Sequence, residues 1–98
     1  MGQWKFTCYS FKDVRKILHK YDENKGISIH DCRKILIGIQ DSIKEIAKFY
    51  MNDEELYDDW IQNIDDDIEL NPDMETVNYR LNEFYSFCDF MKVWLPLR

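Results

Sequence analysis

The strongest constraint on the fold is a repeated spacing of apolar residues in two long segments of the chain. Apolar positions in residues 29–50 are separated by alternating steps of three and four, and they are Ile29, Cys32, Leu36, Ile39, Ile43, Ile46 and Tyr50. Residues 74–95 repeat these steps with Met74, Val77, Leu81, Phe84, Cys88, Met91 and Leu95. Such spacing places side chains along one face of an α-helix, as at the contacts between helices in a bundle. Each segment therefore predicts a long helix that packs against another helix.

Start and stop signals divide the chain into four predicted helices. A residue whose side chain can cap a first turn stands before each of them, and these residues are Ser10, Ser28, Asn52 and Asn71. Gly26 suits the turn after the first helix, Pro72 suits the first position of the last helix, and Pro96 closes that helix. The predicted helices span residues 11–23, 29–50, 53–70 and 73–95.

Length and composition agree with one helical domain. A chain of 98 residues, 45% of them hydrophobic, can bury one core without a disulfide or a metal ion. Three Gly and two Pro are few for a turn-rich β fold. Trp4, Phe6 and Cys8 alternate with polar residues but have no second strand to pair with, so we expect an extended segment there. Because the connections are short, the sequence predicts an all-α fold: a compact antiparallel bundle of about four main helices with a short extended N-terminal segment, in a single domain over residues 1–98.

Acidic residues are concentrated in one third of the chain. No Lys or Arg occurs between Lys48 and Arg80, whereas eleven acidic residues do: Asp53, Glu54, Glu55, Asp58, Asp59, Asp65, Asp66, Asp67, Glu69, Asp73 and Glu75. The segments on both sides carry a small excess of positive charge, so the net charge of −6 comes from this third. Like charges in one region repel each other and oppose folding, which favours a use for them beyond solubility. A partner with a basic surface is the use that we expect.

Several chemistries do not fit the sequence. An EF-hand loop that starts at Asp22 would have its glycine one position early and Arg33 in place of the final Glu, and the loop that starts at Asp65 also fails. No nucleophile or general base accompanies the carboxylates, so we expect no enzyme, no metal and no cofactor. The cysteines Cys8, Cys32 and Cys88 are odd in number and lack metal-ligand spacing, and we expect buried, reduced thiols.

Nucleic-acid and membrane binding are also not expected. A basic stripe of Lys12, Arg15, Lys16 and Lys20 is predicted to be a solvated face, or to pair with the acidic third, rather than to bind phosphates. The chain begins without the apolar stretch of a signal peptide, and no apolar run approaches the ~18–20 residues that span a bilayer. We therefore expect a cytoplasmic protein.

The predicted helix over residues 53–70 carries the candidate binding site. Its apolar stripe is Leu56, Trp60, Ile61, Ile64 and Ile68. The remaining positions are largely acidic, and we expect these carboxylates to face water. Residues 65–67 place three Asp near the negative end of the helix dipole, a local conflict of the kind found at functional sites. Carboxylates raise association rates with basic partners, and aromatic residues among them are typical anchors. The candidate partner-binding residues are Glu55, Tyr57, Asp58, Asp59, Trp60, Asp65, Asp66 and Glu69.

Two aromatic-rich stretches resemble a known family. Residues 79–95 read YRLNEFYSFCDFMKVWL and residues 9–18 read YSFKDVRKIL, and together they cover 27 of the 98 residues. They resemble small helical immunity proteins, which accompany bacterial toxins such as contact-dependent-inhibition effectors and colicins. The resemblance implies a protein that binds a sibling toxin and blocks its nuclease site without chemistry of its own. It implies no particular contact residue, and the acidic contacts above are assigned from charge alone.

Three hypotheses stay open at this point. The first is an immunity protein, predominantly monomeric, that occludes the basic active site of a toxin nuclease. The second is a phage-encoded inhibitor of a host nuclease, which would use the same acidic surface. The third is a regulatory or structural homodimer formed through Phe87, Phe90 and Trp94, which make a second apolar stripe in residues 73–95. The same stripe would also result if this last helix were central in the bundle and contacted on several sides.

Overall fold

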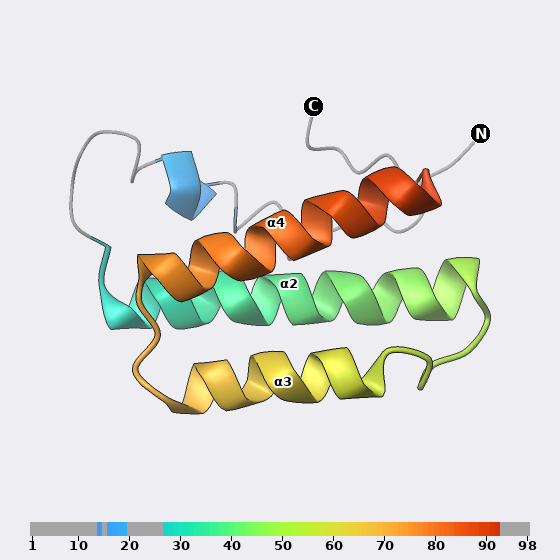
Figure 1. The fold of residues 1–98 in the computed structure, drawn as a ribbon, viewed down its shortest axis with the longest axis horizontal. Helices are drawn as coiled ribbons and strands as arrows, with labels where there is room; N and C mark the ends of the chain where they lie inside the picture. Colours follow the sequence, from blue (N-terminus) through green and yellow to red (C-terminus); the bar gives the residue numbers. More distant parts are fainter. Residues whose placement is uncertain (1–13, 15, 20–26, 93–98) are drawn as a thin grey trace.

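The computed structural model describes Val14, residues 16–19 and residues 27–92 of the chain (Figure 1). Val14 and residues 16–19 are helical and lie within the predicted helix 11–23. Three long helices follow: α2 (Ile29–Tyr50), α3 (Asp58–Glu69) and α4 (Met74–Met91). The predicted all-α fold is confirmed. The predicted cap at Ser10, the extended N-terminal segment and Trp94 lie outside the described residues.

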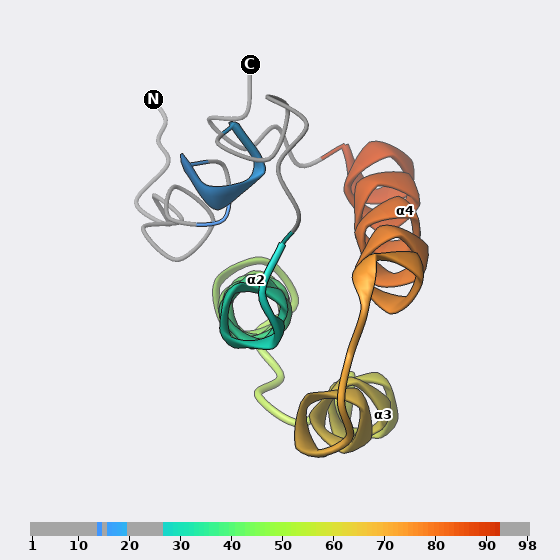
Figure 2. The same ribbon diagram turned by 90° about the vertical axis from the view of Figure 1, so that its left-hand side faces the viewer.

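The helix α2 lies between α3 and α4 (Figure 1). The chain reverses direction at each connection, so α3 is antiparallel to both of its neighbours while α2 and α4 run the same way. Seen along their axes, the three helices stand at the corners of a triangle (Figure 2). Of the helices that the structure describes, α2 makes the main contacts with both α3 and α4. The last helix is contacted by α2 and, through Phe87, by Tyr57 and Trp60 beside and in α3.

The helix α2 begins and ends as its local sequence dictates. Ser28 is the N-cap, and its side-chain oxygen accepts a hydrogen bond of 3.1 Å from the backbone N–H of Asp31. At the other end, the N–H groups of Met51 and Asp53 both donate to the carbonyl oxygen of Ala47, at 3.2 and 3.1 Å. Asn52 makes this turn possible because it adopts the left-handed conformation (φ 56°), which Asn tolerates better than most residues. The predicted bounds of 29–50 are therefore confirmed.

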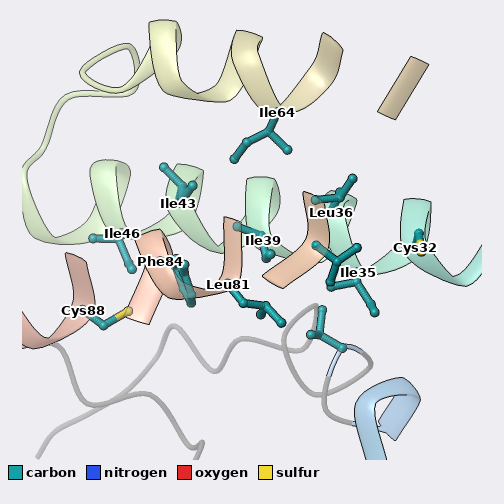
Figure 3. Packing of buried hydrophobic residues seen from close by; sticks show 12 residues of the cluster. Cys32, Ile35, Leu36, Ile39, Ile43, Ile46, Ile64, Leu81, Phe84 and Cys88 are labelled. Carbon is teal, nitrogen blue, oxygen red and sulfur yellow. The ribbon is translucent and has the colours of Figure 1, made fainter. Parts of the chain in front are cut away.

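The core consists mainly of the predicted apolar faces of α2 and α4, closed by Ile64 of α3 (Figure 3). The α2 face is wider than the predicted stripe because Ile35 and Ala47 are buried as well. Its end positions, Ile29 and Tyr50, are exposed. The buried cluster is Val14, Cys32, Ile35, Leu36, Ile39, Ile43, Ile46, Ile64, Val77, Leu81, Phe84 and Cys88.

The predicted start of the third helix was wrong. It was placed at residue 53 with Asn52 as the cap, but Asn52 closes α2, and α3 begins at Asp58 after Tyr57, whose side chain makes no capping bond. The intervening residues form turns, in which the Asp53 carboxylate accepts a hydrogen bond of 3.0 Å from the N–H of Glu55. A cap-like pattern here marks a side-chain turn rather than a helix start.

Both predicted ends of the last helix also needed correction. Its N-cap is Asp73 rather than Asn71, because the Asp73 side chain accepts a bond of 3.0 Å from the N–H of Thr76. Pro72 stands before the cap and is buried instead of opening the first turn. The helix ends at Met91, before the predicted residue 95, because Lys92 adopts the left-handed conformation (φ 58°).

The second apolar stripe of the last helix divides in the structure. Phe87 is half-buried against the core, whereas Phe90 is 81% exposed. Among the described residues, no helix is long and apolar enough to cross a membrane.

Candidate functional site

The helix α3 has two chemically distinct faces. Ile64 is fully buried, and Trp60, Ile61 and Ile68 pack half-buried against the core. The opposite side carries only polar and acidic residues, all of them exposed: Asp58, Asp59, Gln62, Asn63, Asp66 and Glu69. We call its four carboxylates, Asp58, Asp59, Asp66 and Glu69, the acidic face. The predicted exposure of these four candidates is confirmed.

The other two Asp residues of the triplet lie at the edges of the buried side. Asp65 is half-buried and faces α2, where the buried Gln40 side chain donates to its carboxylate (3.4 Å) and to the carbonyl of Ile61 (2.9 Å). Asp67 is half-buried on the side of α4 and pairs with the Arg80 guanidinium at 2.6 Å. Asp65, a predicted contact residue, therefore borders the acidic face instead of lying on it, and Asp67 serves the bundle.

The predicted conflict at the end of α3 is offset by arginines from both neighbouring helices. Arg33 of α2 donates to the backbone carbonyls of Ile68 (2.9 Å) and Leu70 (3.2 Å), which are among the carbonyls that a helix end leaves unpaired. Arg80 of α4 neutralises Asp67, and its other hydrogen bond, at 2.8 Å, goes to Glu83. Sequence reasoning missed both arginines because each lies more than ten positions along the chain from the α3 residue that it contacts.

The predicted aromatic anchors belong to a cluster within the protein. The rings of Tyr57 and Trp60 both meet Phe87 of α4 edge to face, with centroid distances of 5.1 and 5.2 Å. Tyr57 and Trp60 are 6.1 Å apart in the same geometry. The indole N–H of Trp60 donates to Glu83 at 2.9 Å. Both anchors are half-buried, so they hold α3 against α4 and present only part of each ring to a partner.

A continuous exposed stretch connects α2 to α3. Every residue from 48 to 56 is exposed, and we call this stretch the corner segment. It contains Glu55, the remaining predicted contact residue. It also contains four large apolar residues that sequence reasoning did not assign to the site: Phe49, Tyr50, Met51 and Leu56. The available signal was Phe49, which lies off the apolar stripe of α2.

The two cysteines that the structure describes belong to the buried core. Cys32 and Cys88 are buried free thiols. Burial raises the thiol pKa of both, to about 12 for Cys88, so neither is an activated nucleophile. No group of His, Cys, Asp or Glu within the described part of the chain could hold a metal ion.

The comparisons with known proteins give no family. The chain matches no protein-family model, no curated protein and no solved structure.

Proposed function

We propose that this protein is an immunity protein, which binds a cognate bacterial toxin with nuclease activity and covers the basic active site of that toxin. The observation that carries the proposal is the acidic face of α3. Its four carboxylates are exposed, and none of them forms a salt bridge with a described residue. The two described salt bridges are both made by Arg80 and engage Asp67 and Glu83.

An exposed acidic surface that forms no salt bridge with the described residues suits a basic binding partner. Enzymes that act on nucleic acids carry clefts lined with positive charge, and a negative surface approaching such a cleft gains association rate through electrostatic steering. A folded protein whose carboxylates lie on one rigid helix presents them in a fixed arrangement, so little ordering is needed on binding. In this proposal Asp58, Asp59, Asp66 and Glu69 meet the basic cleft directly. Glu55 and Asp65 flank them, and the exposed parts of Tyr57 and Trp60 add contact area.

The test combines capture with growth rescue. The tagged protein, passed through a lysate of its host, should retain one basic protein in equal amount, held more weakly as salt rises. That protein, expressed alone, should arrest growth, and coexpression with this chain should restore it. A retained protein that is harmless when expressed alone would contradict the proposal.

A charge-reversal pair tests the assigned surface. Asp58→Lys with Asp59→Lys should slow association with the captured partner and abolish rescue. Glu75→Lys with Asp89→Lys makes the same change in net charge at two exposed positions of α4 and serves as the control. Equal slowing by both double variants would show that only the total charge matters and would remove the acidic face from the proposal.

A homodimer is the second candidate, and the exposure of Phe90 favours it. An aromatic side chain that is 81% exposed is a typical contact in self-association. Phe87 does not share this role because it packs against Tyr57 and Trp60. Sedimentation decides between the candidates: a dimer that persists at high salt and dissociates on Phe90→Ala favours self-association, and a monomer favours the immunity protein.

A further inference from the structure

The corner segment exposes an unusual amount of apolar surface for a short connection between helices. The exposed fraction is 58% for Phe49, 46% for Tyr50, 36% for Met51 and 43% for Leu56. Such connections normally consist of polar residues, Gly and Pro. Large apolar side chains that are exposed together on one short segment are typical of a surface that another molecule covers.

The corner segment is held in a defined shape by its own backbone. Ala47 accepts two hydrogen bonds from the turn, and Asn52 reverses the chain in the left-handed conformation. The Asp53 carboxylate fixes the next turn through the N–H of Glu55. The turn that carries these apolar residues lies where α2 ends and α3 begins (Figure 1). An ordered display lowers the entropy cost of binding.

The charge around these side chains identifies the kind of partner. Asp53, Glu54 and Glu55 lie within the corner segment, and Asp58 and Asp59 follow at the start of α3, whereas Lys48 is the only basic residue of the segment. A second copy of the chain would bring these carboxylates against their equivalents, which opposes self-association through this surface. An apolar centre with a charged rim is the usual composition of an interface that binds a surface of opposite charge.

We propose that the corner segment anchors the interface: Phe49, Met51 and Leu56 enter an apolar depression on a partner protein whose rim carries Lys and Arg. The basic character of that partner rests on the proposed function. The acidic residues of the corner segment and the acidic face then meet the rim, and the apolar side chains supply the contact that salt does not weaken. This assignment replaces Tyr57 and Trp60 as the principal anchors, because those two rings are already engaged with Phe87.

Two synthetic peptides of equal positive charge provide the probe. One is built from Lys and Leu with the leucines on one helical face, and the other has Gln in place of every Leu. Fluorescence anisotropy should show tighter binding of the Lys/Leu peptide. Phe49→Ala should lower the affinity for that peptide about tenfold and leave the affinity for the Lys/Gln peptide unchanged.

Tyr79→Ala is the matched control, and it should change neither affinity. The exposed fraction of Tyr79, 59%, nearly equals that of Phe49, 58%. Each ring also lies near a cation: Arg80 is 5.1 Å from the ring centre of Tyr79, and Lys48 is 5.5 Å from that of Phe49. Equal binding of the two peptides, equal effects of the two substitutions, or no binding of either peptide would each overturn the proposal.

The growth-rescue assay separates this inference from the proposed function. If Phe49→Ala binds the captured toxin and rescues growth as well as the wild-type protein does, the corner segment is not the anchor and the proposed function stands. If the wild-type protein does not rescue growth, the proposed function fails whatever the peptides show.

Discussion

Two carboxylates of this protein experience opposite environments. Burial raises the pKa of Glu45, and the nearby charge of Asp41 raises it further. One carboxylate oxygen of Glu45 is buried and accepts no hydrogen bond from any residue that the structure describes. The pKa of Asp73 is lowered, chiefly by the hydrogen bond that its carboxylate accepts from the backbone N–H of Thr76. The ionised form of Glu45 therefore opposes folding, whereas that of Asp73 favours it.

These shifts predict opposite effects of two amide substitutions. Glu45→Gln should raise the urea midpoint at pH 7, because the folded protein then no longer holds a poorly solvated charge. The gain should shrink as the pH falls through the raised pKa and vanish below about pH 4, where the wild-type carboxyl is protonated in both states. Asp73→Asn should lower the midpoint at pH 7, and its loss should shrink as the pH falls from about 4 through the lowered folded-state pKa. Midpoints for the three proteins between pH 2 and pH 7, in about one-unit steps, test both signs.

At the scale of the helices, the sequence was most informative where local signals decide the structure. Both bounds of α2 were predicted because its cap, its apolar spacing and its end lie within its own residues. The start of α3 was not predicted correctly, because an Asn followed by a Glu three positions later occurs both at helix starts and in side-chain turns. Only the preceding helix shows that Asn52 belongs to its end. The end of α4 depends in the same way on the backbone of one residue, Lys92.

The contribution of Arg33 to the end of α3 can be measured directly. Arg33→Ala removes two hydrogen bonds to the carbonyls of Ile68 and Leu70, and it should lower the free energy of unfolding by about 1–3 kcal/mol. Lys34→Ala removes an equal charge from the next, exposed position of α2 and should cost much less. Urea unfolding of both variants gives the comparison. An equal loss would mean that net charge, rather than the capping contact, accounts for the effect.

The position of a carboxylate along α3 should determine its effect on stability. Asp59 lies in the first turn, where the helix dipole favours negative charge, and Glu69 is the last residue, where the dipole opposes it. Neutralisation by Glu69→Gln should therefore leave the protein more stable than neutralisation by Asp59→Asn, by about 0.3–1 kcal/mol at low salt. Thermal unfolding measures the difference, which should shrink as salt rises. The reverse order would show that repulsion among the carboxylates outweighs the dipole.

At the scale of the whole molecule, the sequence located the acidic face but not its surroundings. Exposure of Asp58, Asp59, Asp66 and Glu69 followed from the apolar stripe on the opposite side of the same helix. The engagement of Tyr57 and Trp60 with Phe87 did not, because it requires the relative placement of α3 and α4. The exposure of the corner segment was missed for the same reason: an apolar residue at a helix end is buried or exposed according to what lies beside it.

The core and the interaction surface should be separable by mutation, because they occupy different sides of the helices. Leu81 is 5% exposed within the cluster that joins α4 to α2, so Leu81→Ala should lower the free energy of unfolding by about 2–5 kcal/mol. Phe90→Ala removes a larger side chain from the same helix, but this ring is 81% exposed and its loss should cost less than about 0.5 kcal/mol. Urea unfolding measures both costs. Under conditions in which the Leu81→Ala variant is folded, its affinity for the Lys/Leu peptide should equal that of the wild-type protein. The reason is that Leu81 contributes to neither the acidic face nor the corner segment. A weaker affinity in the folded variant would show that the packing of α4 against α2 also sets the shape of the binding surface.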